Sequence, residues 1–423
     1  MNKTIYAKLD ETVYRTTLPC GLTVVVVPKP GFTRKLAYFM TDFGSIHTDF
    51  ELEGQIYSVP AGVAHYLEHK LFEMPGRGDV SGEFAALGAS VNAFTSYDMT
   101  AYYFSCTENF RESLALLLEF VSTPYFPEES VIREQGIIDQ EIGMYLDSPE
   151  SRSFDRLMAS MYSHHPIRVP ILGSRESIRE ITPEILELCH RAFYAPANMI
   201  LCVVGDVDPE AVAETAQRIL GTEKRPIAKK IKNWSEEMTC SESTTQQQME
   251  VAMPAFQLGF KCEAVGIGES AVRGELVGDL AAEALFGESS ELYLHLYEDG
   301  LIDASFGGGF EMVDGCALLT CGGDSLQPEA VRDAILEGAQ KLLQTGIDEE
   351  SFLRMKRSAM GRRIRDLDSF DSTCFRLCAY HLSDFDYFCF PSAYAEVTRE
   401  ELYEFLERVV TARRCALSVI TPM

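Results

Sequence analysis

Apolar residues follow two different periods along the first half of the chain, and together they predict strands alternating with helices. Apolar runs bounded by Gly and Pro predict strands at residues 21–30 and 34–45, on either side of a Pro/Gly turn. Residues 61–72 instead repeat with the period of a helix. Residues 90–106 have the pattern of two further strands around a polar turn. Such a mixture is typical of a sheet covered by helices.

Two longer amphipathic helices are predicted after this strand pair. The first covers residues 110–123, and the second begins after Pro127 and runs to about Leu146. The first half then ends in a buried strand, a glycine turn and another helix. Asp208 is the expected N-cap of that helix, and Pro209 takes its first position, where the missing N–H costs nothing.

A polar stretch divides the chain into two parts of similar length. Residues 223–248 lack any apolar period and include five basic residues between Lys224 and Lys232. We interpret the stretch as a linker rather than a basic binding patch. The predicted domains are therefore residues 1–222 and residues 249–423.

The second half repeats the first weakly. Glu-Glu-Ser begins a predicted helix at residues 128–130 and again at 349–351, and each time it follows a longer amphipathic helix. We predict an α+β fold of two related domains, each a mainly antiparallel β-sheet with helices packed on one face.

The composition of the chain argues against a membrane-spanning protein and against a nucleic-acid-binding protein. The chain has 423 residues, a formal net charge of −27 and no apolar run long enough to span a membrane. The negative charge argues against nucleic acid, whose binding needs a basic surface. It permits cationic peptides as substrates, although solubility is the simpler explanation.

The N-terminus and the cysteines indicate a reducing compartment. Residues 1–21 have no apolar core, so we predict no secretory signal and expect a cytoplasmic protein. Most of the 12 cysteines lie in apolar contexts, as buried thiols do. Cys374 and Cys378 have helical spacing, but without a second Cys or His pair nearby they make a poor structural zinc site.

The chemistry is concentrated in the predicted helix "GVAHYLEHKLFE". His65 and His69 are four residues apart, so both imidazoles project from one face and could share a Zn²⁺ ion. Glu68 lies beside them, placed to take a proton from a water bound to the metal, while Lys70 points away. The string alone could also be a surface helix with a satisfied ion pair.

A third ligand is expected because catalytic zinc usually has three protein ligands. Glu134 and Glu141 are two helical turns apart. We predict that Glu141 is the ligand and that Glu134 supports the site from behind it. Taken alone, both could be solvated helix charges, but a carboxylate on a core-facing apolar stripe is costly unless paired or metal-bound. The predicted stripe comprises Ile137, Ile138, Met144 and Tyr145.

These motifs resemble a known family. His-x-x-Glu-His at residues 65–69, then "GASVNAFTSYDMTAYYFS" at 88–105, then the Glu-x6-Glu pair are similar to the pitrilysin/insulinase metallopeptidases, and most similar to the YmfH-type bacterial members. The resemblance covers nearly the whole first half and is looser in the second. It implies a zinc endopeptidase that acts on unfolded peptides or short precursor segments in a closed chamber.

The resemblance also implies a role for each motif residue. Glu68 would be the general base, Glu134 would support the site, and zinc would be held by His65, His69 and Glu141.

The strand that follows would bind substrate. It would lie at the edge of the sheet and pair with an extended peptide, with Asn92 near the scissile bond and its other contacts made by Ala93, Phe94 and Thr95.

The second half departs from the family pattern. Family members that complete the site carry an Arg and a Tyr where this chain has Glu291 and Asp303, and the repeat places Arg362 at the position of Glu141. Two acids would repel a developing oxyanion. We therefore expect a heterodimer with a related subunit that lacks His-x-x-Glu-His and supplies the Arg/Tyr pair, with a homodimer as the other arrangement. The competing hypothesis is a non-catalytic peptide-binding or structural subunit.

Overall fold

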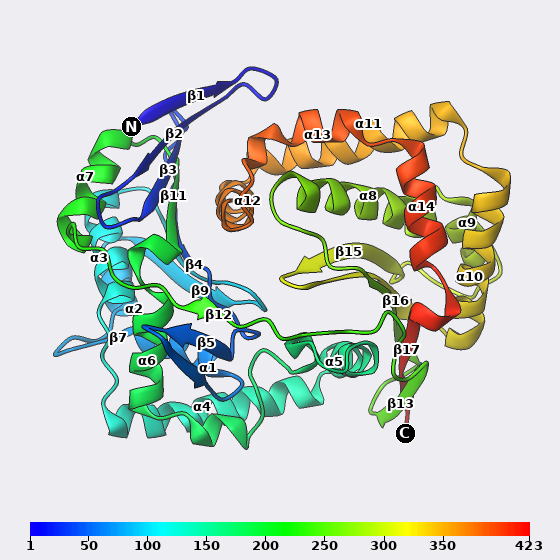
Figure 1. Cartoon of the computed structure of the whole chain (residues 1–423), viewed down its shortest axis with the longest axis horizontal. Coiled ribbons are helices and arrows are strands. Elements are labelled where there is room, and N and C mark those ends of the chain that lie inside the picture. The colour runs from blue at the N-terminus through cyan, green and yellow to red at the C-terminus, as the bar shows by residue number, and fades with distance from the viewer. The chain divides into compact units, whose positions relative to one another are not determined.

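The computed structural model describes all residues 1–423 as two compact units, each assembled from three stretches of chain (Figure 1). The first unit contains residues 1–142, 170–232 and 364–388, and the second contains residues 143–169, 233–363 and 389–423.

The first unit is built on a seven-stranded sheet with the order β1-β2-β3-β11-β4-β10-β9. Only the β3–β11 pair is parallel. The strands predicted at residues 21–30 and 34–45 are β3 and β4, but β11 lies between them. β11 is buried along its whole length, which fits its central place. The strands are β1 (Asn2–Tyr6), β2 (Glu11–Thr17), β3 (Thr23–Pro28), β4 (Lys35–Thr41), β9 (Ala89–Thr95), β10 (Thr100–Cys106) and β11 (Met199–Gly205).

Helices cover both faces of this sheet. α3 and α7 pack on one face, where Phe39 and Leu201 are fully buried, while α12 packs on the opposite face of β4 and β11. Two small sheets, β12-β5-β6 and β7-β8, complete the unit. Its remaining elements are β5 (Asp49–Leu52), β6 (Gln55–Ser58), α1 (Val63–Leu71), β7 (Glu73–Met74), β8 (Gly78–Asp79), α2 (Ser81–Ala86), α3 (Phe110–Ser122), α4 (Glu128–Asp147, whose last turn belongs to the second unit), α6 (Pro183–Phe193), α7 (Pro209–Leu220), β12 (Lys229–Lys230) and α12 (Phe370–Leu382).

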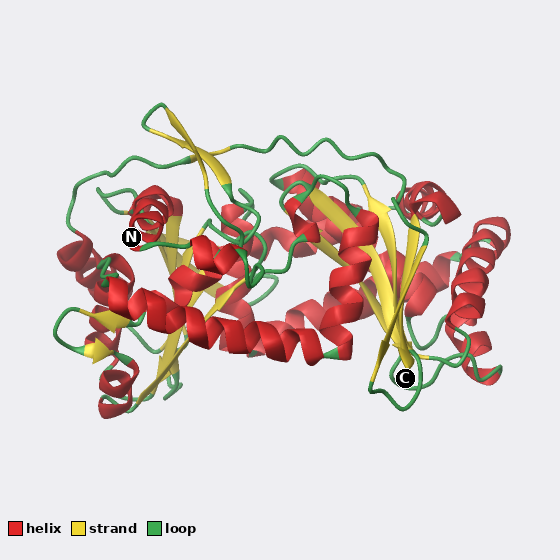
Figure 2. Ribbon diagram, turned by 90° about the horizontal axis from the view of Figure 1, so that it is seen from below, coloured by secondary structure: helices red, strands yellow, loops and turns green.

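The second unit repeats this plan with a five-stranded sheet of order β13-β17-β14-β16-β15, in which only β13–β17 is parallel. α5 packs on β14 and β17, and α8, α10 and α14 also pack on this sheet, so its strands lie between helices (Figure 2). The elements are α5 (Pro149–Met161), β13 (Thr244–Met249), β14 (Ala255–Cys262), α8 (Glu269–Phe286), α9 (Glu291–Glu298), β15 (Gly307–Val313), β16 (Cys316–Asp324), α10 (Pro328–Thr345), α11 (Glu349–Arg365), α13 (Phe390–Glu396), α14 (Arg399–Val409) and β17 (Cys415–Pro422).

The predicted fold class of two related α+β domains is confirmed, but helices cover both faces of each sheet instead of the one face predicted. α5 follows α4 in the chain yet belongs to the second unit, and α12 follows α11 yet belongs to the first. The compact units therefore differ from the linear division into residues 1–222 and 249–423 by an exchange of two segments. The sequence does not predict this exchange. The period of apolar residues shows that one face of a helix is buried, but not which of the two sheets it packs against.

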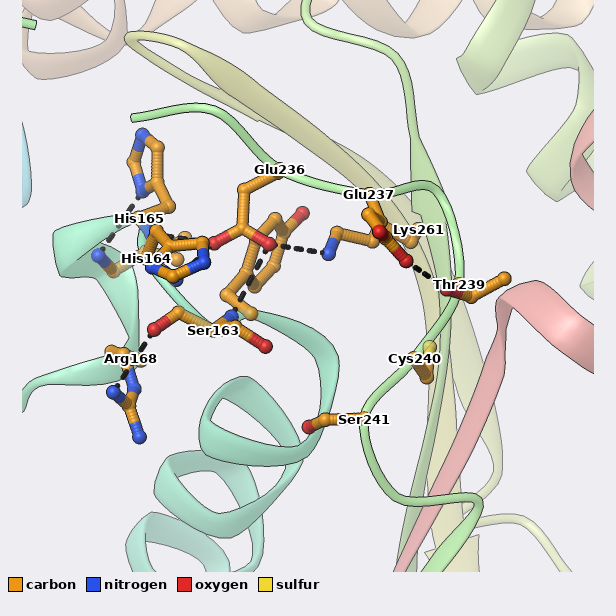
Figure 3. Close-up of polar contacts among 12 residues, drawn as sticks. Ser163, His164, His165, Arg168, Glu236, Glu237, Thr239, Cys240, Ser241 and Lys261 are labelled. Atoms are coloured by element: carbon orange, nitrogen blue, oxygen red, sulfur yellow. Dashed lines mark hydrogen bonds and ion pairs between the residues drawn. The ribbon is translucent and has the colours of Figure 1, made fainter. Parts of the chain in front are cut away.

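The predicted linker contains more structure than its composition indicates. β12 pairs with β5, and β13 forms an edge of the second sheet, although residues 244–249 read TTQQQM and show no apolar alternation. An edge strand that buries only one of its six residues needs no such alternation. Between them, Glu236 is fixed to the second unit, because its carboxylate bonds Lys261 and the backbone of Ser163–His165 (Figure 3).

None of the helices combines the length and the apolar character that a membrane span requires.

Candidate metal centre

α1 is buried in the first unit, and its fixed position determines where the side chains of His65 and His69 lie. The helix begins after Gly62, which has φ +90° and lies so close to the Leu172 carbonyl that a Cβ would stand 2.4 Å from that oxygen. Only glycine fits this entry. One turn apart on α1, the rings of His65 and His69 lie with their centroids 4.5 Å apart.

The start of α4 is fixed against α1 by polar contacts. The Tyr66 hydroxyl donates to the Val131 carbonyl, and the Lys70 ammonium donates to the Ser130 hydroxyl. Lys70 is buried and also pairs with Glu73 at 2.7 Å, so it points away from the histidines as predicted. These contacts fix the rotation and register of α4, and thereby bring its later acidic residues to α1.

Glu141 meets both histidines. Its carboxylate oxygens lie 3.7 Å from His65 Nε2 and 3.6 Å from His69 Nε2, and the three ligand atoms all lie within 4.8 Å of one another. Donors bound at about 2.0–2.1 Å to one tetrahedral zinc ion are separated by about 3.3 Å. The three groups therefore fit a metal ion with only small movements.

Glu134 contacts the opposite side of the His69 ring. Its Oε1 lies 3.0 Å from His69 Nδ1. In the neutral ring, this contact keeps the proton on Nδ1 and leaves Nε2 free to bind a metal, as in the carboxylate–histidine pairs of metal sites. His65 has no equivalent, since its Nδ1 is buried without a hydrogen-bond partner.

The protonation of the cluster follows from burial and charge. Burial, followed by the neighbouring His69, lowers the pKa of His65 to about 3, so this ring is neutral and able to bind a metal. Burial also opposes the charge on His69. However, the hydrogen bond to Glu134 and three nearby carboxylates outweigh it and raise the pKa of His69 above its usual range.

Glu68 lies beside the cluster in a nearly dry position. Its side chain is buried, and burial raises its pKa, although a hydrogen bond from the Thr95 hydroxyl at 2.6 Å acts in the opposite direction. Sequence reasoning placed Thr95 among substrate contacts and missed this bond. The one feature of the sequence that could have indicated this hydrogen bond is the position of Thr95 at the end of a strand expected to lie near the histidine helix.

The chain is similar to known proteins along most of its length. The family model "Insulinase (Peptidase family M16)" matches residues 54–175, and "Peptidase M16 inactive domain" matches residues 180–359. Over 99% of its length, the chain is 36% identical to the Bacillus subtilis zinc protease YmfH, of which it covers 98%. The chain belongs to peptidase family M16.

Solved structures are similar to this M16 chain over nearly its whole length. A putative M16-like peptidase from Alicyclobacillus acidocaldarius has a TM-score of 0.93 at 32% identity, covering 98% of this chain and 99% of that one. A protease from Helicobacter pylori has a TM-score of 0.83 at 21% identity, covering 97% and 99%, and at that identity the likeness shows a common fold.

The predicted substrate strand is the edge strand β9 of the M16 chain. Asn92 Oδ1 accepts a hydrogen bond from the Ala93 N–H at 2.8 Å, and Phe94 packs against Phe375 with ring centroids 5.9 Å apart. Thr95 points to Glu68 instead. Alternation along the strand therefore places Asn92 and Phe94 on the face opposite to Thr95 and Ala93.

The apolar stripe predicted on α4 is wrong in part. Ile138 is fully buried, but Ile137, Met144 and Tyr145 are 49%, 72% and 46% exposed. The face of α4 that packs on α1 carries Val131, Glu134, Ile138 and Glu141. Glu134 and Glu141 therefore contact the histidines of α1 and are not buried in an apolar core. The prediction of Glu141 thus used a stripe of which only Ile138 is buried.

The second-half positions singled out by sequence lie in the second unit. Glu291 begins α9 with 88% side-chain exposure and lies 3.4 Å from Lys341, while Asp303 accepts a hydrogen bond from the Ser305 N–H at 2.8 Å. Arg362 pairs with Glu283 at 2.7 Å. None of these three residues belongs to a group of metal-ligand atoms like that of the first unit.

Proposed function

We propose that this chain is the zinc-binding subunit of a metalloendopeptidase that hydrolyses peptide bonds of unfolded peptides or short precursor segments in a closed chamber. The observation that carries the proposal is the convergence of His65, His69 and Glu141 from α1 and α4 beside the buried Glu68. Several relatives of the chain are named zinc proteases, which supports zinc as the metal.

In this proposal, three side chains hold the zinc ion and one supports them. His65 and His69 bind through Nε2 and Glu141 through its carboxylate, while Glu134 keeps the His69 ring in the required tautomer. Zinc, when bound, acts as a Lewis acid that polarises the scissile carbonyl and makes water more acidic.

Glu68 is the general base. Its buried carboxylate takes a proton from the attacking water and later delivers it to the leaving amine nitrogen. Burial favours this exchange, because it holds the pKa of the carboxylate above the usual range and closer to neutral pH.

The edge strand β9 is proposed to bind the substrate. β9 pairs only with β10, so its other edge can accept an extended peptide as a further strand. In this proposal, Asn92 contacts the peptide close to the scissile bond and Ala93, Phe94 and Thr95 form the rest of the binding strand.

A related partner subunit is proposed to complete the site. Glu291 and Asp303 are acids at positions where the family resemblance implies an Arg and a Tyr, and neither carboxylate donates a hydrogen bond to a developing oxyanion when ionised. A heterodimer in which the partner supplies that pair fits this composition, and a homodimer is the other arrangement.

The same two acids favour one alternative, a subunit that binds peptides or stabilises an assembly without turnover. The two functions differ in their response to Glu68→Gln, which removes the base and leaves the three metal ligands in place.

The test measures zinc content and peptide cleavage of the purified chain, with and without the related subunit lacking His-x-x-Glu-His. We expect one zinc per chain in wild type and in Glu68→Gln, and a loss of cleavage of about 10²–10⁴-fold in the variant. Glu112→Gln, at an exposed position of α3 in the same unit, is the matched control and should keep wild-type activity. Cleavage that survives Glu68→Gln contradicts the mechanism, and zinc binding without any cleavage favours the alternative.

A further inference from the structure

Glu68 accepts a single hydrogen bond from the protein, and it comes from the end of β9. Thr95 Oγ1 lies 2.6 Å from Glu68 Oε2. An ionised carboxylate is an acceptor only, so the hydroxyl hydrogen of Thr95 must point to Glu68. Glu68 Oε1 accepts no hydrogen bond from any residue.

A second hydroxyl stands behind Thr95. Thr100 Oγ1 lies 3.4 Å from Thr95 Oγ1 and 2.8 Å from the Phe43 carbonyl oxygen. Because Thr100 has one hydroxyl hydrogen and the carbonyl is the nearer acceptor, that hydrogen goes to Phe43. The Thr100 oxygen can then accept a hydrogen bond from Thr95, but it lies 3.4 Å away. The Glu68 carboxylate is charged and much nearer, at 2.6 Å, so the hydrogen of Thr95 goes to Glu68.

The backbone that carries Thr95 is fixed by the neighbouring turn. Ser96 N–H donates to the Met99 carbonyl at 2.8 Å, and Ser45 N–H donates to the Ser96 carbonyl at 3.1 Å. Gly44 packs so closely on this turn that a Cβ there would stand 2.5 Å from the backbone of Tyr97. The turn cannot shift without breaking these contacts, so Thr95 is a rigid support.

We infer that Thr95 is a positioning residue for Glu68: its hydroxyl holds Oε2 and thereby assigns the proton transfer to Oε1. In the step, one O–H bond of water breaks, the proton forms an O–H bond with Oε1, and the hydroxide oxygen attacks the peptide carbonyl. Without the Thr95 hydroxyl, the carboxylate can rotate and either oxygen can point away from the water. The inference rests on the proposed peptidase function.

Two substitutions separate the hydroxyl from the shape of the side chain. Thr95→Val keeps the volume and branching but removes the donor, while Thr95→Ser keeps the donor. We expect Thr95→Val to lower kcat about 10–100-fold with KM within about twofold of wild type, since a misplaced base loses part of its 10²–10⁴-fold contribution. Thr95→Ser should stay within about threefold of wild type. Thr107→Val, at an exposed position after β10, is the matched control.

Two measurements do not depend on activity. Zinc affinity should be unchanged within about threefold in Thr95→Val, because the hydroxyl contacts no predicted ligand. A crystal structure of zinc-free Thr95→Val should show the Glu68 carboxylate turned from its wild-type orientation.

Three results would overturn the inference: an unmoved Glu68 carboxylate in Thr95→Val, a wild-type kcat in that variant, or an equal loss in Thr95→Ser and Thr95→Val. If wild type itself cleaves nothing, the proposed function fails, while the orientation of Glu68 in the two crystal structures still decides whether Thr95 positions it.

Discussion

The contact between Glu236 and Lys261 allows a quantitative test of the second unit. Lys261 is 1% exposed and Glu236 is 9% exposed, and their charged atoms lie 2.8 Å apart (Figure 3). The Glu236 carboxylate also accepts from the backbone N–H groups of Ser163 at 3.2 Å, His164, and His165 at 2.6 Å. The Lys261 ammonium lies 4.7 Å from the centre of the Tyr162 ring. Loss of the carboxylate charge would leave this ammonium buried without a counter-charge.

The expected cost of Glu236→Gln is about 3 kcal/mol of unfolding free energy, and two arguments give it. Removing one partner of a buried ion pair costs about 3–5 kcal/mol. Burial opposes the charge on Glu236, but Lys261 and the three N–H groups outweigh it and hold the pKa of Glu236 at about 2. Relative to an unfolded pKa of about 4.3, this difference corresponds to about 3 kcal/mol above pH 5.

The assay is urea unfolding followed by tryptophan fluorescence. Trp234 is the single tryptophan of the chain, lies two residues from Glu236 and packs against His165 with ring centroids 4.5 Å apart. Its emission therefore reports the packing of this segment directly. Because the folded pKa of Glu236 lies below its unfolded value, the stabilisation is present above about pH 4.3 and is lost as pH falls toward about 2. The difference between wild type and Glu236→Gln should shrink over the same interval.

The adjacent Glu237 provides the control. It is exposed and accepts only a 3.4 Å bond from Thr239, so Glu237→Gln should change the unfolding free energy by less than about 0.5 kcal/mol. The double variant Glu236→Gln/Lys261→Met should recover most of the loss, because no buried charge remains. Equal losses of stability in Glu236→Gln and Glu237→Gln, or a double variant less stable than Glu236→Gln, would show that the buried ion pair does not stabilise this unit.

Three further outcomes are expected. Glu134→Gln should weaken zinc binding about 10–100-fold in a chelator competition, because its carboxylate orients His69, and an unchanged affinity would contradict that role. Zinc removal by a chelator should leave the far-ultraviolet circular dichroism unchanged and lower the thermal midpoint of unfolding, since the core of the first unit forms without the ion; collapse of the spectrum would contradict this. In the native chain a maleimide should label the exposed Cys389 fastest, whereas rapid labelling of the buried Cys202 would show that α12 leaves the sheet.

The proximity of the two histidines could be predicted from sequence because it depends on local spacing alone. Residues four apart on one helix share a face, which places His65 and His69 together without knowledge of the fold. Glu141 required the family resemblance as well, since the stripe argument used residues that are mostly exposed. The family pattern also led to the edge position of β9, which the structure shows at the end of the sheet.

The strand order, the contact of Thr95 with Glu68 and the strand β13 could not be predicted from the sequence, each for a physical reason. The insertion of β11 between β3 and β4 depends on long-range pairing, for which two neighbouring apolar runs give no order. The bond from Thr95 to Glu68 joins residues 27 positions apart on two elements, and the hydrophobic pattern says nothing about which hydroxyl will meet which carboxylate. The strand β13 was missed because a polar edge strand lacks the alternation by which strands are found.

The second half of the chain lacks the metal ligands, but it supplies a helix to the first unit. α12 comes from that half, yet it covers β4 and β11 of the sheet that carries the metal site, and its Cys374 Sγ lies 3.8 Å from the Cys202 carbonyl oxygen. Asp386, just after α12, pairs with Arg15 at 2.7 Å. A chain cut at the predicted linker would lose this cover and expose the apolar face of two central strands. The second half of the chain therefore also stabilises the unit that contains the candidate metal site.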